Sequence, residues 1–175
     1  MGSAFTMTRR SSSMSMTYDK ESWLKGFSSC PKETSGVLPS DGTGGAHLPL
    51  DLEGTYFRNG HALFEVGSKK EDRIMHPFDA DGMISAISIK DGEAVFRNRF
   101  VATDGYKQEK RYKRIMGRGA FGTARPGGWI KNIFDLKNKN VANTGVIYWA
   151  GRLLALWEGG LPHRLEADSL RTLGK

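Results

Sequence analysis

Short apolar segments that end in glycine-containing turns recur, roughly every ten residues, through residues 54–175. The chain holds 22 glycines in 175 residues, which is well above average usage. Turns this frequent favour short strands over long helices. We therefore predict an all-β domain, built as a sandwich, a barrel or a propeller. The clearest segments are GTYFRNG (54–60), ALFEVG (62–67), MISAISIKDG (83–92) and EAVFRNRFVATDG (93–105).

Two hairpins are predicted from their turn dipeptides. Ile84 and Ala86 alternate with serines, which is typical of a strand with one buried face. Asp91-Gly92 then predicts a tight hairpin turn into the next segment. The stretch NTGVIYWAGRLLALWE (143–158) is predicted to form two strands around Ala150-Gly151, and a further strand begins beyond it.

One stretch, YKQEKRYKRIM (106–116), is the best helix candidate and is strongly basic. It carries six basic residues when Arg118 is included. A nucleic-acid site would need aromatic side chains to stack on bases, and only Tyr106 and Tyr112 are available. Glu109 and the lack of an RNA-binding signature favour a solvated helix instead. We expect no nucleic-acid partner.

The N-terminal region divides into a tail and the start of the domain. Residues 1–17 contain two arginines, five serines and no acid. This composition fits either a disordered tail or an organelle transit segment, so plastid and cytoplasmic locations both stay open. The domain is predicted to occupy residues 18–175, with a short helix over 18–27 and a glycine and proline loop over 39–49.

Charge and cysteine content set further limits. Lysine and arginine outnumber aspartate and glutamate by 26 to 19, giving a net charge of +7. Such an excess serves solubility or attracts an anionic surface, and the basic helix would suit peripheral membrane contact. Cys30 is the only cysteine, which excludes an internal disulfide and a cysteine-based zinc site. No apolar run approaches the roughly 18 residues of a membrane span.

Four motifs, in this order and spacing, resemble the carotenoid cleavage dioxygenase family over its amino-terminal third. They are LPLDLEGTYFRNGHALFEVG, HPFDADGM, NRFVATDGY and VANTGVIYWAGRLLALWEGGLPHRLEADSLRTLG. The resemblance covers roughly residues 20–175. It implies the first blades of a seven-bladed β-propeller with a short N-terminal helix and loop or helix insertions.

The resemblance also implies the chemistry. Family members use a non-haem ferrous ion, held by histidines, and dioxygen to cleave a double bond of a carotenoid or apocarotenoid. The first family ligand follows Lys175, so the Fe(2+) ligands are expected outside this chain. His47, His61, His76 and His163 match no ligand position and are expected in turns or at the surface. We expect the chain to be inactive and free of stoichiometric iron by itself.

Glu158 is the predicted functional acid. It directly follows Leu156 and Trp157, and an ionised carboxylate in apolar surroundings costs several kcal/mol unless it is paired. The resemblance implies that Glu158 accepts a hydrogen bond from an iron-ligand imidazole and so fixes its orientation. The alternative is a solvent-exposed acid beside the Gly159-Gly160 turn.

Three aromatic residues, Phe78, Phe121 and Trp157, fall where the family lines its substrate tunnel. Aromatic walls suit a rigid polyene, although core packing is the ordinary role of these residue types. Ala80 replaces a family glycine, and alanine would cost on the order of 1 kcal/mol if that position needs a positive φ. Asp79 and Asp81 are expected to cap a turn.

Two functions of different classes follow. The first is an iron-dependent carotenoid dioxygenase, of which the chain is an incomplete part. The second is a non-catalytic module, derived from the same family, that binds an apocarotenoid or interacts with another protein.

Overall fold

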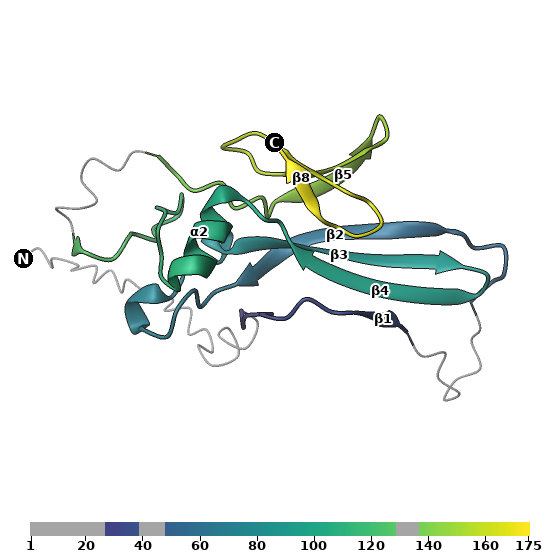
Figure 1. Cartoon of the computed structure of the whole chain (residues 1–175), viewed down its shortest axis with the longest axis horizontal. Helices are drawn as coiled ribbons and strands as arrows, with labels where there is room; N and C mark the ends of the chain where they lie inside the picture. The colour runs from purple at the N-terminus through teal and green to yellow at the C-terminus, as the bar shows by residue number, and fades with distance from the viewer. Residues whose placement is uncertain (1–26, 39–47, 129–136) are drawn as a thin grey trace, which may run out of the picture.

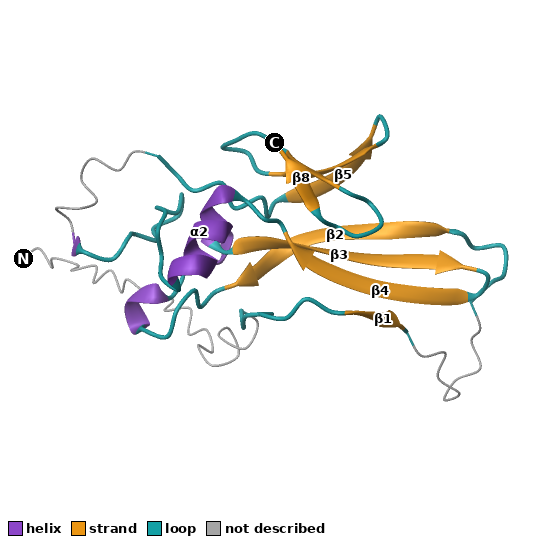
Figure 2. Ribbon diagram, viewed as in Figure 1, coloured by secondary structure: helices purple, strands orange, loops and turns teal. Residues whose placement is uncertain are grey.

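The computed structural model of the chain describes residues 27–38, 48–128 and 137–175. Within these residues, eight strands form two four-stranded antiparallel sheets, accompanied by one α-helix (Figure 1; Figure 2). The prediction of a mainly β structure is confirmed. The N-terminal tail, residues 18–26 of the predicted helix and residues 39–47 of the predicted loop lie outside the described residues.

The first sheet has the strand order β1-β4-β3-β2. Its long strands lie side by side in Figure 1, and the predicted β3–β4 hairpin is confirmed. Asp91 and Gly92 make its turn with φ values of 51° and 78°, the left-handed region that this dipeptide accepts readily. The strands are β1 (Ser35–Val37), β2 (Gly54–Leu63), β3 (Asp81–Lys90) and β4 (Glu93–Phe100).

The prediction of a separate strand over residues 62–67 is wrong. β2 continues through His61 to Leu63, with a register shift between these two residues, and then leaves the sheet. Phe64 instead packs in a separate apolar cluster with Ile74, Ala80 and Ile115. β3 begins at Asp81, which pairs with Leu63, so beyond this point the Phe64 carbonyl instead accepts a hydrogen bond from the Ile74 N–H at 2.8 Å.

The second sheet has the strand order β5-β6-β7-β8 and contains the predicted second hairpin. Ala150 and Gly151 turn the chain between β5 and β6 with φ values of 48° and 73°. The strands are β5 (Gly145–Trp149), β6 (Arg152–Leu156), β7 (His163–Leu165) and β8 (Thr172–Gly174).

The two sheets share one apolar core. Ile84 and Ala86 of β3 are fully buried, as the alternation with serines predicts. They pack in one cluster with Leu153 and Ala155 of β6 and with Leu165 of β7. Because residues from both sheets remove their apolar surface from water together, the sheets stabilise each other.

The basic helix α2 (Asp104–Tyr112) begins and ends earlier than predicted from 106–116. The Thr103 hydroxyl oxygen accepts a hydrogen bond from the Tyr106 N–H at 3.0 Å and caps the first turn. Lys113 adopts a left-handed conformation with φ 50°, which ends the helix. Two short 3-10 turns, η1 (Lys70–Asp72) and η2 (Pro77–Asp79), precede β3.

Candidate functional site

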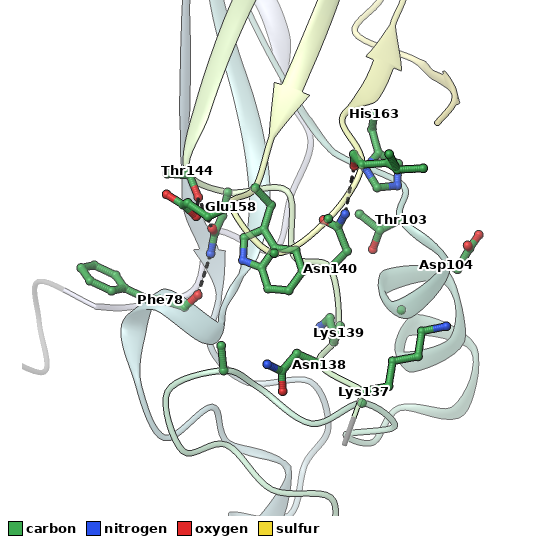
Figure 3. Close-up of a pocket in the computed structure, with 18 of the residues that line it drawn as sticks. Phe78, Thr103, Asp104, Lys137, Asn138, Lys139, Asn140, Thr144, Glu158 and His163 are labelled. Atoms are coloured by element: carbon green, nitrogen blue, oxygen red, sulfur yellow. Dashed lines mark hydrogen bonds between the residues drawn. The ribbon is translucent and has the colours of Figure 1, made fainter. Parts of the chain in front are cut away.

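A pocket of about 1340 Å³ lies where the ends of several elements meet (Figure 3). Its walls come from η2, the first turn of α2, the loop over 116–125 and the segments over 137–144 and 157–163. Glu158, Trp157, Phe78 and Phe121 all line it. The structure therefore gathers all four predicted site residues around one cavity, the usual form of a small-molecule site.

Glu158 is hydrogen-bonded to Thr144 at the open end of the β5–β6 hairpin, opposite its turn. Thr144 directly precedes β5 and Glu158 follows β6, and the antiparallel pairing of Gly145 with Leu156 brings them together. The Thr144 hydroxyl donates a 2.8 Å hydrogen bond to Glu158 Oε2, drawn in Figure 3. This bond lowers the pKa of Glu158, so the carboxylate stays ionised at neutral pH. Glu158 is exposed, and Thr144 is its side-chain partner among the described residues.

Asparagines that our sequence analysis did not single out fix the segment before Thr144. Asn143 Nδ2 donates to the carbonyl oxygens of Phe78 and Ala80 at 2.9 and 2.8 Å. Asn59 Nδ2 donates, at 2.8 Å in each case, to two carbonyls around Thr144. The asparagine-rich run KNKNVANTG (137–145) was the sequence signal for these contacts, because asparagine amides need hydrogen-bond partners once they are buried.

A buried ion triad underlies the pocket floor. Lys139 Nζ lies 2.8 Å from Asp81 Oδ2 and 2.6 Å from Glu109 Oε2, and all three side chains are almost fully buried. Glu109 Oε1 also accepts hydrogen bonds from the N–H groups of Met116 and Gly117. The basic face of α2 is exposed, as expected of a solvated helix, but Glu109 itself is buried because α2 turns this acid inward toward Lys139.

Burial and charge shift the pKa values within this triad. Burial raises the pKa of Asp81 to about 6, despite the opposing attraction of Lys139. Burial alone would lower the pKa of Lys139, but the carboxylates of Asp81 and Glu109 outweigh it and raise that pKa. Lys139 is therefore a permanent cation that cross-links β3, α2 and the segment leading to Thr144.

The two aspartates of the HPFDADGM motif have different roles. Asp79 accepts hydrogen bonds from the Phe121 and Thr123 N–H groups at 2.9 and 3.0 Å, so it caps a distant loop. Asp81 caps no turn, contrary to expectation, because Lys139 engages it. Ala80 between them has φ −74°, an ordinary extended value. The strain considered for alanine at this position is absent.

Aromatic side chains form a wall on one side of the pocket. The rings of Phe78 and Phe121 lie 5.4 Å apart, edge to face, and are 52% and 54% exposed. Core packing therefore does not explain them. Trp157 is half-buried, and a Cβ added at Gly159 would lie 2.6 Å from its ring, so the glycine lets the chain turn over the indole. Tunnel lining stays a prediction for these three aromatic residues.

Two of the histidines differ from the expectation. His61 was expected in a turn but lies half-buried within β2. His61 and His76 contact the aromatic wall, and His76 stacks on Phe121 at 5.0 Å. His163 was expected in a surface loop but is buried in β7 and lines the pocket. His47 lies outside the described residues. In the described part of the chain, no three His, Cys, Asp or Glu residues are placed to hold a metal ion.

No helix within the described ranges is long and apolar enough to cross a membrane.

Comparison with known proteins assigns the chain to a protein family. Residues 27–175 match the family described as retinal pigment epithelial membrane protein. The apocarotenoid-15,15'-oxygenase of a Synechocystis strain is 46% identical over 166 residues, which is 94% of this chain and 32% of that protein. The chain belongs to the carotenoid cleavage dioxygenase family.

A plant relative and a solved structure also match the chain. Carotenoid cleavage dioxygenase 7 of Arabidopsis thaliana, described as chloroplastic, is 36% identical over 146 residues, covering 79% of this chain and 22% of its own length. The crystal structure of cobalt-substituted Synechocystis apocarotenoid oxygenase superposes with a TM-score of 0.80 at 46% identity, covering 88% of this chain and 31% of that one. The chain thus spans about a third, or less, of the length of these relatives.

Solved variants of the Synechocystis oxygenase carry substitutions at a spacing that recurs in this chain. One variant changes a threonine, another a tryptophan thirteen residues later, and two more the glutamate that directly follows the tryptophan. Thr144, Trp157 and Glu158 have the same identities and the same spacing here.

Proposed function

We propose that residues 18–175 form the first blades of a seven-bladed β-propeller oxygenase that uses Fe(2+) and dioxygen to cleave a double bond of a carotenoid or apocarotenoid. The Thr144–Glu158 hydrogen bond at the rim of an aromatic-walled pocket carries this proposal. Two four-stranded antiparallel sheets have the form expected of propeller blades. The chain spans about a third of the length of the Synechocystis relative, so the activity is proposed for an oxygenase that also contains the remaining blades.

Glu158 is proposed as the acceptor for the N–H of an iron-ligand imidazole that this chain does not supply. Its carboxylate is ionised, and Thr144 occupies only Oε2 and orients the group. An exposed carboxylate held in one orientation is suited to fix the tautomer and angle of a ligand ring.

The metal would be held elsewhere. The Fe(2+) ligands are proposed to lie outside this chain, and the described residues contain no group of three His, Cys, Asp or Glu that fits the metal. When bound, the ferrous ion would supply the activation of dioxygen. The part of this chain is to shape the pocket, orient a ligand imidazole through Glu158 and bind the polyene along Phe78, Phe121 and Trp157.

A non-catalytic apocarotenoid-binding module is the second candidate. The aromatic wall and the pocket are assembled from this chain alone, whereas no metal-holding group is present among its described residues. Binding without cleavage in every longer form of the protein would favour it. Two relatives described as chloroplastic support a plastid location for either candidate.

Binding of a polyene tests the proposal directly. Tryptophan fluorescence of the full chain should be quenched saturably by an apocarotenoid, because Trp157 lies in the pocket wall. Phe121→Ala should weaken binding roughly tenfold, since a lost aromatic contact is worth about 1–2 kcal/mol. Tyr148→Ala is the matched control, because Tyr148 is 63% exposed and does not line the pocket. Equal affinity in both variants would contradict the aromatic wall.

A further inference from the structure

The side of the pocket opposite Glu158 contains a buried histidine without a partner. His163 is only 2% exposed, and its backbone is fixed by the pairing of β7 with Ala155 of β6. Its Nδ1 is buried and makes no hydrogen bond within the described residues. Figure 3 shows His163 at the side away from Thr144 and Glu158. A buried imidazole nitrogen left unpaired costs free energy, and His163 lines the pocket, so a ligand there would supply the ring with a polar partner.

The first turn of α2 lies on the same side of the pocket. Thr103 caps the helix, and Asp104 and Gly105 line the cavity at its N-terminus, where unpaired N–H groups give a partial positive charge. Lys175 Nζ lies 2.7 Å from Asp104 Oδ2 and neutralises that carboxylate. The local field therefore favours an atom with partial negative charge.

Burial, followed by the charge of Lys175, lowers the pKa of His163, so the ring is neutral at physiological pH and offers one N–H. The chemistry that fits a neutral donor beside a helix N-terminus is a neutral oxygen acceptor.

We propose that His163 and the N-terminus of α2 bind the carbonyl oxygen at the end of an apocarotenoid aldehyde. This proposal rests on the proposed function, because it seats one end of the polyene here and the remainder along the aromatic wall. Trp157 and Asn140 line the same cavity as His163. The site would thereby distinguish an aldehyde-ended polyene from a hydrocarbon of equal length.

The test compares two ligands on the full chain by quenching of tryptophan fluorescence: an apocarotenal and the apocarotene hydrocarbon of the same chain length. The unmodified protein should bind the aldehyde roughly three- to tenfold more tightly, the effect of a single net hydrogen bond. In His163→Leu this preference should disappear, while affinity for the hydrocarbon stays within about twofold.

Two further variants keep the result interpretable. His163→Gln retains an N–H donor and should keep part of the preference, even if His163→Leu does not fold. Gln108→Leu is the matched control, because Gln108 lines the pocket from α2 but is exposed, so its amide exchanges a hydrogen bond with water at little net gain.

The outcomes separate this proposal from the one on which it rests. Equal affinity of the unmodified chain for the two ligands, or a preference that survives in His163→Leu, would overturn the carbonyl site while leaving polyene binding in place. Failure of both ligands to bind would overturn the proposed function itself.

Discussion

The smallest feature with a large structural effect is the side chain of Lys139. Its ammonium joins Asp81 and Glu109, and its aliphatic stem runs between two glycines. A Cβ at Gly105 would lie 2.7 Å from Lys139 Cγ, and one at Gly117 would lie 2.8 Å from Lys139 Cβ. The absence of side chains at these two positions is what admits the lysine to the interior.

Lys139→Met should therefore be strongly destabilising. The substitution keeps most of the volume but leaves two carboxylates buried without a cation, which costs about 3 kcal/mol or more in the free energy of unfolding. Urea denaturation followed by tryptophan fluorescence measures it. Lys137→Met, at an exposed neighbouring lysine, should change stability by less than about 0.5 kcal/mol. Similar midpoints for the two variants would show that the triad contributes no net stability.

At the scale of elements, the start of β3 is the junction between the two sheets. The Gly82 N–H donates to the carbonyl of Val141 at 2.9 Å, and the Val101 N–H donates to the carbonyl of Gly82 at 2.9 Å. A Cβ at Gly82 would lie 2.1 Å from the carbonyl oxygen of Ala142. This close backbone contact sets the position of the segment that leads to Thr144.

Gly82→Ala should force β3 away from that segment and lower the free energy of unfolding by about 2 kcal/mol or more, because a backbone atom cannot move aside as a side chain can. Gly60→Ala, in the neighbouring strand β2, is the matched control, since nothing lies within 4 Å of its Cβ. Chemical denaturation compares the two. The close-contact interpretation fails if Gly82→Ala is as stable as Gly60→Ala.

At the scale of the whole molecule, the chain supplies a pocket and a positioning acid, and its described residues supply no metal site. The first sheet, the second sheet and α2 all contribute residues to that pocket. The proposed function therefore assigns the iron-dependent step to residues other than those described.

We expect the chain by itself to contain far less than one iron per molecule and to release no cleavage product. A chimera that joins residues 1–175 to the remaining two thirds of the Synechocystis relative should bind iron and cleave an apocarotenoid. Glu158→Gln in this chimera should lower activity or metal affinity roughly 10- to 100-fold, as substitutions of residues that orient metal ligands do. Metal analysis and chromatography of the products measure both quantities.

Stoichiometric iron in the chain alone would refute the placement of the ligands outside it. A chimera that binds iron and apocarotenoid but cleaves nothing would favour the non-catalytic module. Full activity of Glu158→Gln would remove the role proposed for this acid.

The parts of the fold that the sequence predicted depend on neighbouring residues. Asp91-Gly92 and Ala150-Gly151 specify their hairpins because the left-handed backbone of a tight turn is a property of the residues that form it. The alternation around Ile84 and Ala86 predicted their burial for the same local reason. The ordered motifs then identified the family and drew attention to Glu158 and the aromatic wall.

The tertiary structure alone decided the partners. Lys139 meets Glu109 from 30 positions away and Asp81 from 58, and Asn59 reaches the segment around Thr144 across more than 80. Nothing in the local pattern near Glu109 or His163 distinguishes a buried polar side chain from a solvated one. Composition and periodicity report which face of an element is apolar, whereas the pairing of buried polar groups depends on which distant segments the shared core brings into contact.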